Sequence, residues 1–298
     1  MASLEIHPLS GLRDEAANLL AERYARQRAA EPLLPDVGHF EAQLPEEGHV
    51  ATRAGEVVAY LAGAVDRTSE MARWPFAGHA AREPEALRDL FAFQTRELGV
   101  SRFMLTVPAT DPALIDVWFR LAFGCQAVWA VREVGPADPV EFGGSIRRAT
   151  PDDLEAIVDF DQLLYDHQVT APSFSEFSAP PRDELRAEAS EIWADDTYIP
   201  FLAEIGGEAV GMLGLYRRPE GDLRVPSSNI DLSFAVTRDE VRGSGAGVAL
   251  TAFALRWAHE HGFRSMTVDW RSVNLLSSRF WPRRGFRPQY LRLYRAVP

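Results

Sequence analysis

A short glycine-rich segment followed by an apolar run carries the strongest chemical signal in the sequence. In "VRGSGAGVAL", residues 241–250, glycines stand at 243, 245 and 247 behind an arginine. Glycine lets the backbone turn tightly and approach a ligand without a Cβ clash. The apolar residues that follow, at 250, 253, 254, 257 and 258, have helical spacing. A helix that begins at such a loop directs free N–H groups and the positive end of its dipole at one point, which predicts an anion site.

Three kinds of phosphate ligand compete for this loop, and the sequence excludes one. A nucleoside-triphosphate loop requires a lysine, but all 31 basic residues of the chain are arginines. A dinucleotide loop requires G-x-G-x-x-G and an acid about 20 residues later. The third glycine is missing here, although Asp269 stands where the acid would. The third ligand is the pyrophosphate of an acyl-CoA, and on the loop alone the last two remain open.

The elements that must position this loop belong to an internal repeat. Segments 51–63 and 203–215 share Gly-Glu in a turn and the same apolar alternation, which predicts two hairpins. Segments 99–123 and 262–286 each contain a glycine, a strand, a polar helix cap and a tryptophan at matching places. The segment 133–144 is rich in Pro and Gly, as linkers are. We therefore predict two copies of one α/β unit, with domains at 1–135 and 145–298.

The second copy has a readable order of elements around the loop. We expect a strand near 145, a helix capped by Thr150, a second helix over 182–195 and a hairpin of strands over 200–204 and 209–216. The strand 229–236 leads into the glycine loop and its helix. The strand 265–270, a helix capped by Asn274 and a last strand over 288–297 complete the order, which places the loop at a strand-to-helix turn.

Two separate motifs together resemble the GNAT N-acetyltransferase superfamily. Arg242, Gly245 and Gly247 fit that family's R/Q-x-x-G-x-G/A loop, and "NLLSSRFWPRRGF", residues 274–286, fits the spacing of its N-x-x-A-x-x-[LF]-Y-x-x-x-G-F segment. The resemblance covers the whole second half in element order. The first half looks like a degenerate copy, because "HAAREP", residues 79–84, stands where its loop would be. The resemblance implies an α/β fold of two tandem GNAT-like mixed sheets flanked by helices.

By this resemblance the second half binds acetyl-CoA and transfers its acetyl group to an amine by direct attack, without a metal. The backbone of the strand before the loop would hold the pantetheine arm, the loop would hold the pyrophosphate, and two residues of the downstream motif would lie along the thioester. In that order the implied residues are Phe234, Ala235 and Val236; Arg242, Gly243, Ser244, Gly245, Ala246 and Gly247; and Asn274 and Trp281.

The candidates for general acid and base come from several positions. Trp281 stands where the family has its tyrosine acid, and an indole N–H cannot give up its proton at working pH, so water or another hydroxyl, such as Tyr290 or Tyr294, would protonate the thiolate. We expect Asp231 to be the base, because family bases often lie on the strand before the loop and alternation places Asp231 on one face with Ala235. His167 is a second candidate near the pocket.

Charge restricts the partners. The net charge of −12 argues against nucleic acid, whereas residues 241–298 contain ten arginines against Glu260 and Asp269, which suits a polyanionic ligand. Acids concentrate on the first two helices of the second half, which favours a small cationic amine as acceptor: Asp152, Asp153, Asp159, Asp161, Asp166, Glu184, Glu188 and Glu191. No segment resembles a signal or a membrane span, so we expect a cytoplasmic protein, as a monomer or a homodimer.

Two other functions remain open on these residues. A non-catalytic acyl-CoA sensor is favoured by the missing tyrosine, and an NAD(P)-dependent oxidoreductase is favoured by Asp269.

Overall fold

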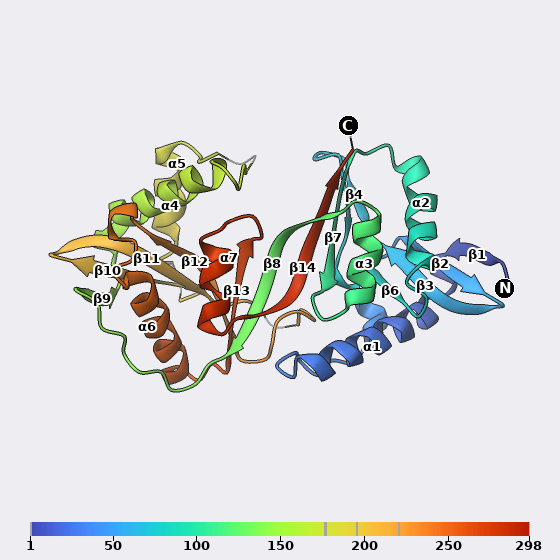
Figure 1. Cartoon of the computed structure of the whole chain (residues 1–298), viewed down its shortest axis with the longest axis horizontal. Coiled ribbons are helices and arrows are strands. Elements are labelled where there is room, and N and C mark those ends of the chain that lie inside the picture. Colours follow the sequence, from blue (N-terminus) through green and yellow to red (C-terminus); the bar gives the residue numbers. More distant parts are fainter. Residues whose placement is uncertain (1, 176–177, 195, 220, 298) are drawn as a thin grey trace. The chain divides into compact units, whose positions relative to one another are not determined.

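The computed structural model describes residues 2–175, 178–194, 196–219 and 221–297 (Figure 1). The chain is mixed α/β and divides into two compact units, Met1–Trp129 with Pro288–Pro298, and Ala130–Arg287. The predicted ranges were 1–135 and 145–298. The division differs mainly at the end of the chain, because the last strand packs with the first unit.

Unit 1 contains two sets of strands. The set in the order β1-β2-β3-β6 is antiparallel, and in the order β4-β5-β7-β14 strand β7 is parallel to β5 and antiparallel to β14. Its strands are β1 (Leu4–Pro8), β2 (Gly48–Arg53), β3 (Glu56–Ala62), β4 (Ala64–Asp66), β5 (Met71–Trp74), β6 (His79–Ala81), β7 (Arg102–Pro108) and β14 (Arg287–Ala296), and β8 (Gly124–Glu133) begins in unit 1 and ends in unit 2. Its helices are α1 (Arg13–Ala30), α2 (Ala86–Leu98) and α3 (Pro112–Arg120). An aromatic core of Trp74, Phe91, Phe103 and Trp118 joins α2 and α3 to the strands.

Unit 2 contains strands in the order β13-β12-β11-β10-β9. Neighbouring strands are antiparallel except β12 and β13, which are parallel. The strands are β9 (Ser145–Arg148), β10 (Tyr198–Ile205), β11 (Glu208–Tyr216), β12 (Asn229–Thr237) and β13 (Ser265–Arg271). The helices are α4 (Leu154–Val169), α5 (Arg182–Glu191), α6 (Ala246–Glu260) and α7 (Ser277–Phe280). Short 3-10 turns occur at Leu9–Gly11, Phe40–Gln43, Phe76–Gly78, Pro151–Asp153, Asp239–Val241 and Pro282–Arg284.

Side-chain alternation along the strands of unit 2 separates its helices onto opposite faces. Leu202 and Met212 share a core cluster with α4 and α5. The neighbouring Phe201 points to the other face, where its ring meets those of Phe253 and Trp257 of α6. This arrangement confirms the predicted amphipathic helix after the glycine loop.

The predicted order of elements is confirmed in the second copy, and the predicted hairpin and strand-helix pair are confirmed in the first. The two hairpins are β2–β3 and β10–β11, and the strand-helix pairs are β7–α3 and β13–α7. The helix expected over 182–195 ends at Glu191, and Asp195 lies outside the described residues. Among the described helices, none combines the length and apolarity that a membrane span needs.

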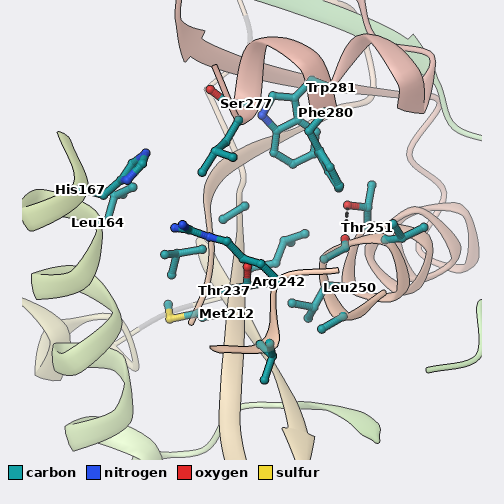
Figure 2. Close-up of a pocket in the computed structure, with 18 of the residues that line it drawn as sticks. Leu164, His167, Met212, Thr237, Arg242, Leu250, Thr251, Ser277, Phe280 and Trp281 are labelled. Carbon is teal, nitrogen blue, oxygen red and sulfur yellow. Dashed lines mark hydrogen bonds between the residues drawn. The ribbon is translucent and has the colours of Figure 1, made fainter. Parts of the chain in front are cut away.

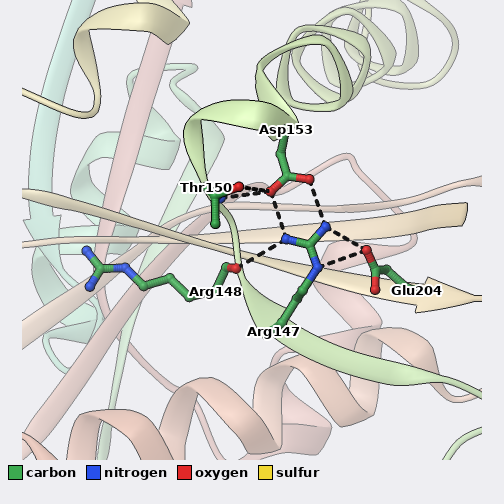
Figure 3. A network of polar contacts seen from close by, with 5 residues as sticks. All are labelled: Arg147, Arg148, Thr150, Asp153 and Glu204. Atoms are coloured by element: carbon green, nitrogen blue, oxygen red, sulfur yellow. Dashed lines mark hydrogen bonds and ion pairs between the residues drawn. The ribbon is translucent and has the colours of Figure 1, made fainter. Parts of the chain in front are cut away.

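An ion-pair network attaches the start of α4 to the sheet of unit 2 (Figure 3). Arg147 of β9 donates to both carboxylate oxygens of Asp153 at 2.7 Å and to Glu204 of β10 at 2.7 and 2.9 Å. The Thr150 N–H also donates to Asp153, at 2.7 Å. Hydrogen bonds from Arg147 lower the pKa of Asp153 to about 2. The network therefore fixes the helix whose far end reaches the pocket described next.

Candidate functional site

A cavity of about 450 Å³ lies in unit 2 where the glycine loop meets α4, β12 and α7 (Figure 2). This volume falls within the usual range for small-molecule sites, roughly 300–1,000 Å³. It is lined by Leu163, Leu164 and His167; Met212 and Leu213; Ala235, Val236 and Thr237; Val241, Arg242, Gly243, Gly245, Ala246, Gly247, Val248, Leu250 and Thr251; and Asn274, Leu276, Ser277, Phe280, Trp281 and Arg284.

The glycine loop forms the turn from β12 into α6. Gly243 and Gly245 have φ angles of +89° and +91°, a backbone conformation that side-chain-bearing residues rarely adopt. Gly245 is the N-cap of α6 and provides no side-chain hydrogen bond. Most helices satisfy their first N–H groups with a polar N-cap side chain. Here a glycine holds that position, so apart from the Ala246 N–H, which donates to the Ser244 hydroxyl at 3.4 Å, the first turn of α6 leaves N–H groups for an external acceptor.

Arg242 adds a charge to the loop. Its guanidinium lies 2.5 Å from a carboxylate oxygen of Asp239, which is mostly exposed. Figure 2 shows the Arg242 side chain extending across the cavity toward the part of α4 that carries Leu164 and His167. Exposed ion pairs contribute little to stability, so Arg242 can exchange this carboxylate for a phosphate at small cost.

The end of β12 opens away from β13. The parallel pairing covers Asn229–Leu232 and ends there, whereas β12 stays paired with β11 as far as Thr237. The β13-facing edge of β12 beyond Leu232 is thus not used by that ladder. Ala235, Val236 and Thr237 of this segment line the cavity, so a backbone edge is available to an extended ligand.

Helix α7 and the turn before it form the opposite wall. The Asn274 side chain accepts hydrogen bonds from the Leu276 and Ser277 N–H groups at 3.0 and 3.3 Å, as expected of a cap. Trp281 is buried, and its ring packs edge-on against Phe280 and Phe286. Ring packing holds Trp281 in place at the cavity wall.

Most residues predicted to hold the cofactor line this one cavity: Ala235, Val236, Arg242, Gly243, Gly245, Ala246, Gly247, Asn274 and Trp281. Two do not. Phe234 packs against the core cluster of α4 and α5, and the Ser244 hydroxyl accepts the Ala246 N–H at 3.4 Å. Sequence reasoning did not assign Met212, Leu213, Thr237 or Thr251, although Thr251 follows Gly247 by one helical turn and donates to its carbonyl.

Asp231, the expected base, does not line the cavity. Its side chain is 2% exposed, and one carboxylate oxygen accepts from Arg218 at 2.6 and 3.0 Å. The other oxygen accepts from the Thr267 hydroxyl at 2.8 Å. The prediction assumed regular alternation, but the β11–β12 register shifts at Ser233 and so breaks the alternation between Asp231 and Ala235. The structure corrects this assignment and gives Asp231 a buried ion pair.

Of the other residues considered for a chemical role, only one lines the cavity. Asp269 is exposed and is not among the lining residues, which removes the geometric support for a ribose acid. Tyr290 and Tyr294 lie on β14, paired with β7 in unit 1, and neither lines the cavity. His167, in the last turn of α4, does line it. Among the described lining residues, His167 is the only histidine, and a neutral imidazole can act as a general base.

Comparisons with known proteins agree with this geometry. Residues 162–286 match the model of the acetyltransferase (GNAT) family. Similar solved structures include a GNAT-related N-acetyltransferase from Sphaerobacter thermophilus, with 13% identity and a TM-score of 0.59 over 98% of this chain and 95% of that one. A tandem GNAT protein from the clavulanic acid biosynthesis pathway has 16% identity and a TM-score of 0.51 over 99% of both chains.

A GNAT-family acetyltransferase from Colwellia psychrerythraea is also similar, with 12% identity and a TM-score of 0.54 over 99% of this chain and 100% of that one. A search of the curated proteins found no match. At these identities the solved structures show the fold, which is the predicted tandem arrangement, and the family model covers the segment that builds the cavity. Residues 162–286 of the second unit thus match the GNAT acetyltransferase family model, and the chain as a whole has the tandem GNAT fold.

Proposed function

We propose that unit 2 binds acetyl-CoA and transfers its acetyl group to the primary amine of a small acceptor. One observation carries the proposal: the glycine loop, the open edge of β12 and the wall of α7 all border a single cavity. That combination provides an anion site, a slot for an extended polar chain and an apolar end in the order that a CoA thioester requires.

The loop would hold the pyrophosphate. N–H groups at the start of α6, together with the guanidinium of Arg242, provide donors at the positive end of a 15-residue helix. Gly247 lines the cavity without a side chain, and an added Cβ there would already contact Thr237 and Phe280 at 3.7–3.8 Å. A larger residue at this position would occupy space beside the phosphates.

The pantetheine arm would pair with the backbone of Ala235 and Val236, and the thioester would lie near Asn274 and Trp281. The acceptor amine then attacks the acetyl carbonyl carbon, the C–S bond breaks, and the amine loses one proton while the CoA thiolate gains one. His167 faces the cavity from α4 and is our candidate base for the amine proton. Solvent would protonate the thiolate, because an indole cannot.

Not all of the acidic residues on α4 and α5 are available to attract a cationic acceptor. Asp153 and Asp159 pair with Arg147 and Arg182 at 2.7 and 2.8 Å, so their charges are already compensated. Asp161 lies one turn before Leu164 on α4, and burial together with Glu188 raises its pKa to about 6. We therefore assign the attraction for an amine to the region of Asp161 and Glu188.

Titration calorimetry with acetyl-CoA, with NADH in a parallel experiment, tests the ligand. Arg242→Gln should weaken acetyl-CoA about tenfold or more, because a charge-assisted hydrogen bond contributes roughly 1.5–3 kcal/mol. Arg283→Gln is the matched control, since Arg283 is exposed and does not line the cavity but carries the same charge. Binding of NADH without acetyl-CoA, or equal loss in both variants, would contradict the proposal.

Turnover distinguishes the enzyme from a non-catalytic acyl-CoA sensor, which Trp281 at the tyrosine position still favours. Release of free thiol in the presence of a panel of primary amines supports transfer. In that assay His167→Gln should lower kcat while leaving the Kd of acetyl-CoA unchanged. Tight binding with no thiol release across the panel would favour the sensor.

A further inference from the structure

Unit 1 contains a second cavity, of about 220 Å³, between α1 and the turn that follows β7. It is lined by Arg23, Arg26, Gln27, Pro108, Thr110, Asp111 and Pro112. Arg23, Gln27 and Pro108 are buried, whereas Arg26, Thr110 and Pro112 are exposed. The cavity therefore has a buried floor and a rim that solvent reaches.

Gln27 on the floor lacks partners within the described part of the chain. Its side chain is 3% exposed, and neither its Nε2 nor its Oε1 has a hydrogen-bond partner there. Burying an amide without partners is unfavourable, and leucine would fill the same space without that cost. A polar side chain that lines a cavity under these conditions indicates a ligand that both accepts and donates a hydrogen bond.

Arg23 places a cation beside Gln27. Its two terminal nitrogens donate to the carbonyls of His79 and Phe76, and its guanidinium lies 4.1 Å from the centroid of the Phe76 ring. The side chain is 1% exposed, and its Nε has no partner among the described residues. Asp111 in the same lining acts on this charge electrostatically, but with Arg26 the lining holds two guanidinium groups against one carboxylate, so the floor favours an anionic group.

Asp111 provides the opposite charge at the turn. One of its carboxylate oxygens accepts the Leu114 N–H at 3.1 Å and so caps α3. Asp111 also lines the cavity, next to Thr110. The lining thus joins cationic Arg23 and Arg26 with one carboxylate, a combination that matches a ligand carrying charges of both signs.

By the internal repeat, this cavity corresponds to one part of the larger cavity in unit 2. Asp111 matches Asn274 in the repeat, and α1 and α4 are the first helices of their units. In unit 2, α4 and Asn274 line the larger cavity together with the glycine loop. Unit 1 has "HAAREP" in place of that loop, and its cavity has about half the volume. A CoA-sized ligand does not suit this site.

We propose that unit 1 binds a small zwitterionic amino acid in this cavity. The ligand carboxylate would accept hydrogen bonds from the Gln27 Nε2–H and the arginines, and the ammonium would donate to the Gln27 Oε1 and to Asp111. The volume equals that of about seven water molecules in the liquid, which suits a compact amino acid. This site is independent of the function proposed for unit 2.

The test uses the full chain with the twenty amino acids as probes, screened by thermal shift and confirmed by titration calorimetry. For any amino acid that binds, its decarboxylated amine and its deaminated acid are titrated in parallel. We expect one site per chain, with both analogues at least tenfold weaker. Equal binding of the deaminated acid would show an anion site only, and binding of none of the twenty would show that the cavity holds water; each result overturns the proposal.

Two variants locate the site. Asp111→Asn keeps a capping oxygen for α3 but removes the charge, so it should raise the Kd at least tenfold. Gln27→Leu should abolish binding and raise the melting temperature of the ligand-free protein, because it removes the unpartnered amide; this rise also shows that the variant folds. His167→Gln, in the cavity of unit 2, should leave the Kd unchanged. Loss of binding in His167→Gln with retention in Gln27→Leu would overturn the assignment.

Discussion

The backbone at Gly245 offers a direct way to separate the fold of unit 2 from its ligand site. Gly245 has a φ angle of +91°, which a residue with a Cβ adopts at a cost of roughly 1–2 kcal/mol. The methyl group of Gly245→Ala would itself fit, because its nearest neighbour is the Phe142 Cβ at 3.7 Å, an ordinary contact. The substitution therefore changes backbone strain and little else.

In the free protein an alanine at position 245 relaxes the loop away from positive φ. Binding of acetyl-CoA must then restore the strained loop, because only that conformation presents the N–H groups at the start of α6. The full 1–2 kcal/mol is thus lost from binding, which corresponds to a Kd about 5- to 30-fold higher. Calorimetric titration measures this change, and urea unfolding measures stability in the same variant.

Gly262→Ala is the matched control for strain. Gly262 follows α6, has a φ angle of +81°, has no atom within 4 Å of an added Cβ and does not line the cavity. It should lower the free energy of unfolding by a similar roughly 1–2 kcal/mol and leave the Kd unchanged. A wild-type Kd in Gly245→Ala would refute the assignment of the loop to the pyrophosphate, and equal weakening in both variants would show a global effect.

Two further predictions concern buried charges. Asp231→Asn should lower the free energy of unfolding by about 2 kcal/mol in urea titrations, because it leaves Arg218 without its carboxylate, and should leave kcat for acetyl transfer unchanged; a large fall in kcat at unchanged stability would return Asp231 to the chemistry. Burial and Arg23 lower the pKa of His79 to about 3. Below pH 6.5 the unfolded chain therefore binds a proton at His79, whereas the native chain does not. Its contribution to stability is complete above that pH and decreases by about 2 kcal/mol between pH 7 and 5. His79→Gln should remove this part of the pH dependence of unfolding, and an unchanged slope would contradict the assignment.

Much of the site could be predicted because its signals are local. The spacing of glycines in 241–250 requires only neighbouring residues to form a turn and a helix start, and the structure places Gly243 and Gly245 at positive φ. Asn274 caps its own turn. The hairpins likewise depend on adjacent strands, so the internal repeat was visible without any long-range contact.

The misassignment of Asp231 shows where local reasoning fails. One extra residue at Ser233 is enough to change which face Asp231 occupies, and the signal for that shift lies in the pairing with β11. Similarly, Tyr294 was considered as an acid because it follows the motif closely in sequence. The chain carries it into β14, where it pairs with Met104 of β7 in unit 1.

The sequence by itself determined the α/β order of elements, the repeat, the anion-binding turn and the exclusion of lysine chemistry, since each depends on residue types and short spacings. Only the tertiary structure decided which side chains share a cavity: that His167 arrives beside Arg242 from 75 residues away, that the edge of β12 opens beyond Leu232, and that Gln27 is buried without a partner among the described residues. The physical reason is that these contacts depend on strand register and helix packing. Both bring together residues that are far apart in the sequence and show no local pattern that predicts the contact.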